Sequence, residues 1–290
     1  MANRNTKKRV SKTDRYKEYG IEYRTSDGKV FCDPLGIWVT LPLQFGTNTK
    51  IGLAATWSIT HGNEYFNVAD LESKFPKTAE IMRVAGITVI KGSCPFHCTD
   101  CYCDNGNYRY DTVKASIMLR LILATYCMEW LKNCIIAQIK IEEIKQCRIH
   151  ASGDFFSMDY VNMWIDIAIT CDDVIFWTYT KFEYALKAFE SITNIFIVPS
   201  VTPFGFNFGT CSELIYRYNK LTAMGYKVHI CACGTKYESH CADCKTGCKA
   251  VGVDCDFVLF IKHSCKGYKA GKNDPIEFDI VCDIIANQNN

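Results

Sequence analysis

The sequence has no apolar run approaching the roughly 20 residues that a membrane-spanning helix needs. Nothing in its first 30 residues looks like a secretory signal. It also has no internal repeat and no low-complexity linker. Its net charge is only +2, so the protein as a whole is not a polyanion binder. We therefore expect a cytoplasmic protein with no membrane partner.

Basic residues are concentrated at the start of the chain. Residues 1–20 contain seven lysines and arginines against two acids, and no apolar run. We expect a basic disordered tail over 1–20, and contact of this tail with nucleic acid is the alternative interpretation. The whole chain has 290 residues, of which 48% are hydrophobic, enough for one large core or two small ones.

Cysteine, in contrast, is abundant, with 18 residues. In a reducing cytosol cysteines act as metal ligands, catalytic thiols or small core residues, and disulfides are rare. Those that stand singly in apolar segments are predicted to be core side chains. They are Cys127, Cys134, Cys147, Cys171 and Cys282. The clustered cysteines need another explanation.

The chain is predicted to be an α/β protein. Residues 21–84 form an N-terminal extension of short strands and a helix over 68–84 that is broken at Pro76, and residues 85–290 form the β/α core. The predicted core strands are 85–92, 146–151, 173–180, 194–201, 226–233 and 256–264. The helices between them are 111–144 (as one helix or two), 158–170, 182–192 and 212–225. The near-continuous apolar strands indicate a parallel sheet, in either a doubly wound fold or a partial barrel.

Functional groups gather at the carboxyl ends of strands in both of these folds. The turn Ser152–Gly153–Asp154 ends the second predicted strand and Lys181 follows the third. Lys181 is either a ligand for a carboxylate or phosphate or a solvated loop residue. His150 and His263 also end strands, and each is expected to be a hydrogen-bonded core histidine.

The segment KGSCPFHCTDCYCDNG (91–106) contains the first cysteine cluster. Cys94, Cys98 and Cys101 have the spacing C-x3-C-x2-C, which can bind three corners of an iron–sulfur cube and leave one iron open. Cys103 is predicted not to be a ligand, because the other three already fill the pattern. A zinc site is the alternative, in which Cys98 and Cys101 pair with Cys241 and Cys244.

A second cysteine cluster follows the fifth predicted strand, in a loop over 231–255. Cys233, Cys241, Cys244 and Cys248 could hold a complete cube suited to electron transfer or structural support. Cys231 is the alternative fourth ligand, because it lies on the same strand face as Cys233. A plain zinc site is again the other interpretation.

The first cluster, placed after a strand of a six-unit β/α chain, resembles that of the radical S-adenosylmethionine superfamily. The resemblance implies a partial (β/α)6 barrel, with a [4Fe–4S] cluster on the three cysteines and S-adenosylmethionine on its open iron. Ser152, Gly153 and Asp154 would form the turn that contacts the amine of that cofactor, and Tyr102 and Lys181 would lie beside it. A reductase or flavodoxin-like protein would supply electrons.

A second resemblance covers more of the chain. The segments TKIGLAATWSIT (49–60), SCPFHCTDCY (93–102), RIHASGDFFS (148–157), FWTYTK (176–181) and HCADCKTGC (240–248) are similar to the phage gene product 88 family. This implies expression in the host cytoplasm. We predict a radical S-adenosylmethionine enzyme carrying two clusters. The alternatives are a non-catalytic iron–sulfur protein for electron transfer or redox sensing, and a zinc-stapled nucleic-acid-binding protein.

Overall fold

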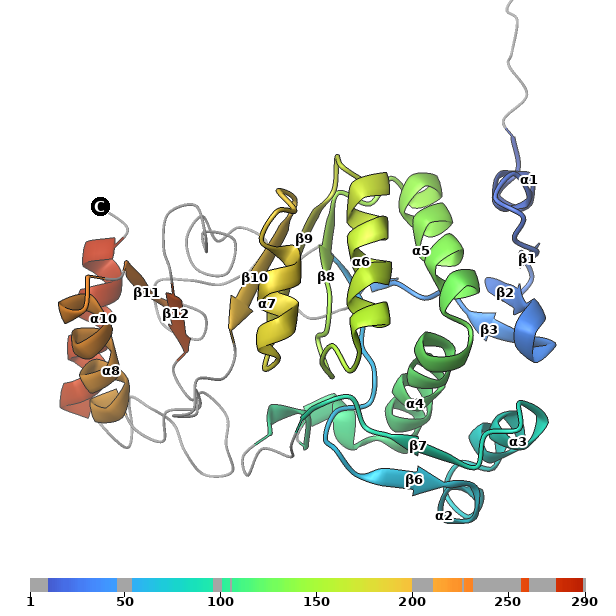
Figure 1. Ribbon diagram of the computed structural model, residues 1–290, viewed down its shortest axis with the longest axis horizontal. Helices are drawn as coiled ribbons and strands as arrows, with labels where there is room; N and C mark the ends of the chain where they lie inside the picture. The colour runs from blue at the N-terminus through green and yellow to red at the C-terminus, as the bar shows by residue number, and fades with distance from the viewer. Residues whose placement is uncertain are drawn as a thin grey trace, which may run out of the picture.

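The computed structural model describes residues 10–45, 54–95, 101–104, 106–199, 211–225, 227–231, 257–260 and 275–288 (Figure 1). These residues form a mixed α/β protein. Its strands make four separate sheets, and none of these sheets closes into a barrel within the described ranges. No helix in those ranges has the length and apolar character required to span a membrane.

The helices and strands follow one another along the chain in two parts. The first part contains α1 (Lys12–Lys17), β1 (Tyr23–Arg24), β2 (Lys29–Cys32), the 3-10 helix η1 (Asp33–Leu35), β3 (Ile37–Thr40), β4 (Gln44–Phe45), β5 (Ala55–Thr56), β6 (Tyr65–Asn67), α2 (Val68–Glu72), α3 (Pro76–Val84), β7 (Val89–Lys91) and the 3-10 helices η2 (Tyr102–Asp104) and η3 (Gly106–Arg109). The second part contains α4 (Asp111–Tyr126), α5 (Met128–Glu142), β8 (Gln146–Arg148), α6 (Met158–Thr170), β9 (Ile175–Thr180), α7 (Glu183–Phe189), β10 (Ile195–Pro199), α8 (Cys211–Ala223), β11 (Val228–Cys231), β12 (Phe257–Phe260) and α10 (Pro275–Gln288).

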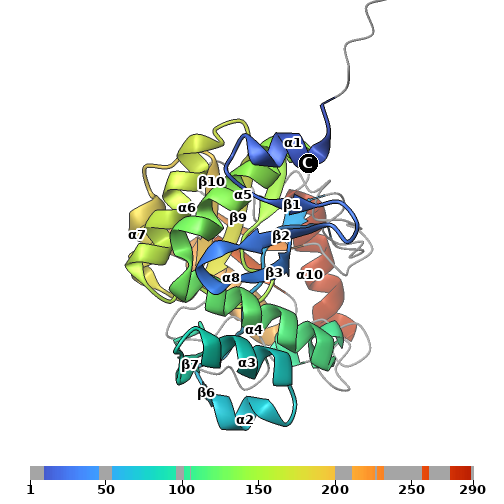
Figure 2. The ribbon, with the colours of Figure 1, turned by 90° about the vertical axis from the view of Figure 1, so that its right-hand side faces the viewer.

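The central sheet has the order β10-β9-β8-β5-β4. β5, β8, β9 and β10 are parallel neighbours in sequence order, and β4 joins the edge antiparallel. Helices α5, α6 and α7 lie on one face of this sheet (Figures 1 and 2). Successive right-handed crossovers between adjacent strands place their helices on one face. The four parallel strands therefore contain no reversal of order, unlike a doubly wound sheet.

The first parallel strand is β5 and not the predicted strand at 85–92. The chain continues beside β8 beyond β5, because Trp57 N donates to Arg148 O at 3.0 Å and Ile59 N donates to Ser152 O at 3.0 Å. β7, by contrast, pairs antiparallel with β6 outside the central sheet, and both Val89 and Lys91 are exposed. The central sheet therefore contains strands from both sides of residue 84, the predicted boundary between extension and core. The buried run that fills the sheet is ATWSIT at 55–60.

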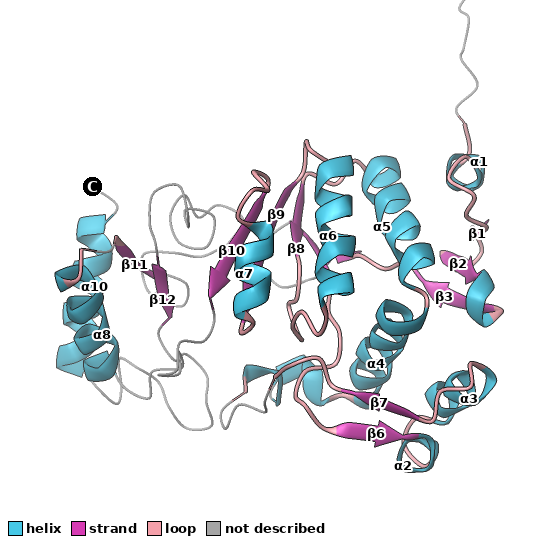
Figure 3. Cartoon of the chain, viewed as in Figure 1, coloured by secondary structure: helices cyan, strands magenta, loops and turns pink. Residues whose placement is uncertain are grey.

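Residues 61–93 form an excursion from the central sheet (Figure 3). It contains β6, α2, α3 and β7, and Pro76 begins α3, so the predicted break of the helical segment is confirmed. The chain then returns to its starting point, where Ser93 N donates to Thr60 O at 3.0 Å and Cys94 N donates to Gly62 O at 2.8 Å. The first cysteine cluster is thereby brought to the carboxyl end of β5.

The predicted disorder of the tail over 1–20 is wrong for residues 12–17, which form α1. Ser11 caps this helix by accepting a hydrogen bond from Asp14 N. Tyr16 is fully buried and stacks on Tyr23 with ring centroids 4.7 Å apart. Lys12 Nζ lies 2.7 Å from Glu142 Oε1 on α5. One buried aromatic side chain thus anchors a segment whose composition is otherwise that of a solvated tail.

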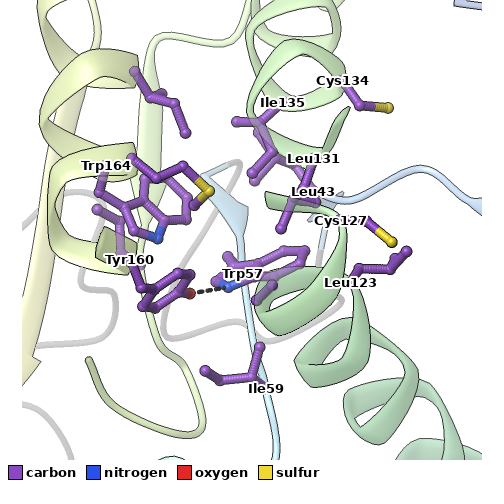
Figure 4. Close-up of a cluster of buried hydrophobic side chains, with 14 of the residues drawn as sticks. Leu43, Trp57, Ile59, Leu123, Cys127, Leu131, Cys134, Ile135, Tyr160 and Trp164 are labelled. Atoms are coloured by element: carbon purple, nitrogen blue, oxygen red, sulfur yellow. Dashed lines mark hydrogen bonds between the residues drawn. The ribbon is translucent and has the colours of Figure 1, made fainter. Parts of the chain in front are cut away.

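The remaining predicted elements of the core are present. The segment 111–144 forms two helices, because the chain leaves helical geometry at Cys127, whose φ is −129°. The five single cysteines predicted to be core side chains are all buried, which confirms that prediction. At the centre of the core, Trp57 Nε1 donates a hydrogen bond of 2.6 Å to the Tyr160 hydroxyl (Figure 4).

A smaller core lies beyond β10. β11 and β12 pair in parallel, and α8 and α10 pack on them around Leu214, Leu259 and Val281. β12 is the strand of this pair that approaches β10 (Figure 1).

Candidate metal and cofactor site

Cys94, the first residue of the first cysteine cluster, and the acidic turn lie on the same edge of the sheet. Ser93 Oγ donates a hydrogen bond of 2.7 Å to Thr60 O and accepts one of 3.0 Å from Asp154 N. Cys94 follows Ser93 directly and is buried. Residues about 60 positions apart in the sequence are therefore joined where the carboxyl ends of β5 and β8 meet.

Gly153 makes this close approach possible. Its φ is +89°, a conformation that side chains with a Cβ rarely adopt. A Cβ at this position would lie 2.5 Å from Ile59 Cγ1 and 2.7 Å from Ser93 Oγ. The glycine thus lets the turn pack directly against the strand and against the residue before the first cysteine.

Asp154 joins the ends of three segments. Its Oδ1 accepts hydrogen bonds from Phe155 N at 2.8 Å and Thr180 Oγ1 at 2.7 Å, and its Oδ2 accepts one from Lys181 N at 2.8 Å. Burial raises the pKa of this carboxyl to about 6, although the charge of Lys181 and the hydrogen bonds oppose the rise. A carboxylate offers about four acceptor positions. Three are used by these neighbours, and no other described residue donates to the fourth, which is on Oδ2.

Ser152 is held by the same strand. Its Oγ donates to Ile59 O at 3.0 Å and lies 3.3 Å from His61 Nδ1. All three residues of the predicted cofactor turn thus have structural contacts with the strand or the loop that precedes the cysteines.

The two described cysteines of the predicted triad differ in their surroundings. Burial raises the pKa of the Cys94 thiol to about 11, and the positive charge of Lys181 opposes the rise. A hydrogen bond from the Cys103 thiol lowers the pKa of Cys101 to about 6 and so favours the thiolate, the form that binds metals. The Cys94 and Cys101 thiols are close enough to couple electrostatically. These donors fit a thiolate-ligated metal group.

His61 and Asp104 complete a set of donors that the sequence did not indicate. One ligand atom from each of His61, Cys101 and Asp104 lies within 4.8 Å of the other two. His61 Nε2 is 3.1 Å from Asp104 Oδ1. His61 directly follows residues 55–60, which include β5 and run beside β8. The first central strand was expected at 85–92, so the position of His61 at the edge of the sheet was not predicted.

Three other predicted site residues lie in or directly after described elements, namely Lys181, Tyr102 and Cys231. Lys181 directly follows β9 on the same edge, and the backbone of Tyr102 begins η2. Cys231 ends β11. Several predicted ligands and one histidine lie outside the described residues, namely Cys98, Cys233, Cys241, Cys244, Cys248 and His263.

His150 is a buried core histidine, as predicted. Its Nε2 is 3.0 Å from the Tyr160 hydroxyl, and its ring packs edge-on against Phe155. Burial lowers the pKa of His150 to about 3, so the imidazole is neutral near pH 7.

These features define an α/β protein that presents cysteine, histidine and carboxylate donors at the carboxyl ends of its parallel strands. The family model described as gene product 88 matches residues 48–202, more than half of the chain. The chain therefore belongs to the gene product 88 family of phage proteins, which confirms the predicted family. The match includes β5 to β10 and the first cysteine cluster and ends before the second. Searches of curated proteins and of solved structures gave no significant match.

Proposed function

We propose that the protein is an iron–sulfur enzyme of the radical S-adenosylmethionine type, in which Cys94, Cys98 and Cys101 hold a [4Fe–4S] cluster. The observation that carries this proposal is the hydrogen bond between Ser93 and Asp154. It sets the first cysteine beside an acidic turn that has one acceptor position to spare. The thiolate-favouring surroundings of Cys101 support the same assignment.

We propose a partial (β/α)6 barrel as the scaffold. β5, β8, β9 and β10 would supply four of its strands in sequential order, and β12 and β11 would supply the other two, with β12 next to β10. The sequential order of the first four strands and the position of their helices on one face support this assignment.

The residues of the edge would have separate tasks. A [4Fe–4S] cluster with bound S-adenosylmethionine supplies reductive formation of a 5′-deoxyadenosyl radical, which abstracts hydrogen from a substrate. Asp154 would accept a hydrogen bond from the ammonium of the cofactor, a charge-assisted contact that is stronger than a neutral one. Lys181 would bind its carboxylate, Ser152 and Gly153 would shape the turn, and Tyr102 would lie beside the ligand.

The second cysteine cluster would hold an auxiliary [4Fe–4S] cluster. Its proposed ligands are Cys233, Cys241, Cys244 and Cys248, with Cys231 as the alternative to Cys233. The protein would work in the host cytoplasm with a reductase or flavodoxin-like electron donor. Without S-adenosylmethionine cleavage, the same clusters would suit electron transfer or redox sensing.

A zinc protein is the second candidate. The observation that favours it is the convergence of His61, Cys101 and Asp104, since nitrogen, sulfur and carboxylate donors are all zinc ligands. In this alternative the zinc would have a structural role, and the basic residues of 1–20 would contact nucleic acid.

Metal analysis after anaerobic purification tests these candidates. Two cubes require about eight irons per chain with matching sulfide, because each complete cube contains four. Replacement of Cys94, Cys98 and Cys101 together by alanine should remove about half of this iron. Cys282→Ala, which changes a buried cysteine of α10, is the matched control and should retain it. A colourless protein containing zinc and little iron would overturn the main proposal.

Catalysis is tested separately on the iron-loaded protein. Dithionite and S-adenosylmethionine should yield 5′-deoxyadenosine, measured by liquid chromatography. The triple alanine variant should yield none. Iron-loaded protein that releases no 5′-deoxyadenosine would instead support the electron-transfer or sensing alternative.

A further inference from the structure

Arg120 is a buried cation inside an apolar helix. It lies in the middle of α4, it is the only charged residue between positions 115 and 126, and it is 7% exposed. Its Nε and Nη2 atoms are buried and have no hydrogen-bond partner. No described carboxylate forms an ion pair with it, although most buried arginines are paired.

Aromatic rings and a second arginine surround this position. Arg120 Cζ lies 5.9 Å from the centroid of the Trp57 ring, and Arg148 Cζ lies 5.3 Å from that of Tyr179. Both guanidinium groups lie close enough to the Tyr108 hydroxyl to act on it electrostatically. That hydroxyl donates a hydrogen bond of 3.1 Å to Ala151 O. The two cations are thus gathered where β5 and β8 lead to the edge that bears the cysteines.

An unpaired guanidinium at this position is costly. Burial lowers the pKa of Arg120 to about 10, so it keeps its charge near pH 7. A buried charge that no described carboxylate neutralises loses its hydration and gains only the weaker attraction of the Trp57 ring in return. An apolar side chain would suit α4 better, since neighbouring Ile117, Leu121 and Ala124 are all buried. A counter-ion that enters with a ligand would offset this cost.

We propose that Arg120 anchors an oxyanion site, which binds the carboxylate or phosphate group of a small-molecule ligand at the carboxyl ends of β5 and β8. A guanidinium presents a planar fork of donors that binds either group through two parallel hydrogen bonds. Parallel strands present ligands at this edge. The oxyanion site does not depend on which metal the cysteines bind, because in either case no carboxylate of the described residues pairs with Arg120.

Thermal unfolding of the purified full-length chain tests the site, with inorganic phosphate as the probe and chloride at equal ionic strength as the reference. Phosphate at one hundred times its Kd should raise the Tm of the native protein by about 5 °C. Arg120→Met should abolish this shift. In phosphate-free buffer the same variant should have a higher Tm than the native protein, because it removes an unpaired buried charge.

Arg83→Met is the matched control. Arg83 is an exposed arginine that pairs with Glu72 and Glu80, so its loss should leave the phosphate shift unchanged. The opposite pattern would overturn the proposal. That pattern is a lower Tm for Arg120→Met in phosphate-free buffer, with no anion effect that depends on Arg120.

Calorimetric binding of two adenosine compounds identifies the source of the anion. S-adenosylhomocysteine has an amino-acid carboxylate, and 5′-methylthioadenosine lacks it. If this carboxylate fills the Arg120 site, in place of the Lys181 contact proposed above, the native protein should bind S-adenosylhomocysteine at least tenfold more tightly, and Arg120→Met should lose the preference. If a phosphate-bearing substrate fills it, Arg120→Met should bind S-adenosylhomocysteine as the native protein does while losing only the phosphate shift. Both results support the oxyanion site, and the absence of both effects overturns it whatever metal is found.

Discussion

Ser93 Oγ accepts a hydrogen bond of 3.0 Å from the backbone N–H of Asp154. Ser93 directly precedes Cys94, the first residue of the first cysteine cluster. The contact therefore links this cluster to Asp154, a buried carboxylate in the turn that follows β8. It fixes the distance between a candidate metal ligand and a candidate cofactor contact before either group is bound. The edge of the sheet is therefore preorganised by hydrogen bonds within the protein.

Gly153→Ala should destabilise the protein by about 2 to 4 kcal/mol, because the new Cβ adds overpacking to an unfavourable left-handed backbone. Urea denaturation measures the change in the free energy of unfolding. Gly86→Ala is the control, since Gly86 also has a positive φ of +68° but an added Cβ would have no neighbouring atom within 4 Å. It should lose only about 1 to 2 kcal/mol. Equal losses in the two variants would contradict the close packing at Gly153.

Asp154 should make stability fall as pH rises. Its pKa in the folded protein is about 6, above the ordinary value of 3.8, so the folded state holds this proton more tightly than the unfolded state. The resulting stabilisation is complete below about pH 4 and is lost as pH rises through 6, with a total of about 3 kcal/mol. The groups that face the carboxyl are Lys181, Cys94, Tyr160 and Tyr184. Burial raises the pKa values of Cys94, Tyr160 and Tyr184, so these three groups stay neutral in that window.

The measurement is urea unfolding of the native protein and of Asp154→Asn between pH 5 and 7. The asparagine does not titrate, so the stability of the native protein relative to the variant should fall by about 1 kcal/mol across this interval. The asparagine side chain also loses a hydrogen bond that the Asp154 carboxylate accepts. This loss lowers the stability of the variant equally at every pH, so it does not change how the difference between the two proteins depends on pH. A difference that stays constant with pH would show that the carboxyl titrates normally.

The sequence predicts the β/α alternation well because its signal is local. Apolar runs gave β8 to β12, and helical spacing gave α6 with its observed bounds. The first strand was misassigned because Val89 and Ile90 are as β-branched as a strand of the central sheet, yet they belong to a two-stranded sheet outside it, in which Ile90 is buried and Val89 is exposed. What decides between the two segments is the non-local pairing of residues 55–60 with β8, which no local pattern records.

Only part of the candidate site was predicted, because local patterns do not record which distant residues come together in the fold. Asp154 and Cys94 stand out by residue type and by position after apolar segments. His61 and Arg120 do not, since His61 follows residues 55–60, which were not predicted to be a central strand, and Arg120 looks like a single polar interruption in α4. Their significance depends on what surrounds them in the fold. A charged residue in an otherwise apolar helix was the one available signal for Arg120.

Tyr160→Phe should cost about 1 to 3 kcal/mol, because it leaves the buried Trp57 Nε1 without its hydrogen-bond acceptor. It also removes the hydroxyl that lies 3.0 Å from His150 Nε2. Urea denaturation gives the change in unfolding free energy. Tyr19→Phe, at an exposed position, is the control and should change it by less than about 0.5 kcal/mol. A loss for Tyr160→Phe no larger than the control would show that this hydrogen bond contributes little.

Cys101 and Cys103 are neighbouring thiols, and only one of them is expected to bind the proposed cluster. Cys103 is 2% exposed, and its thiol hydrogen-bonds to Cys101, so both sulfur atoms lie near the proposed cluster. Cys103→Ser should retain the full iron content, because a serine hydroxyl can still donate to the Cys101 thiolate. Cys101→Ser should lose about half of the iron, since a ligand of one of the two cubes is removed. His61→Asn should also retain the iron if the cluster uses cysteines alone.

Iron and zinc analysis of these three variants, with Cys282→Ala as the reference, separates the possible ligand sets. Loss of iron in Cys103→Ser together with its retention in Cys101→Ser would make Cys103 the third ligand and change the motif to C-x3-C-x4-C. Zinc that disappears in both His61→Asn and Cys101→Ser would identify the mixed donor set as the real site. In that event the hydrogen bond between Ser93 and Asp154 would have a structural role alone, because the acidic turn would have no cofactor to face.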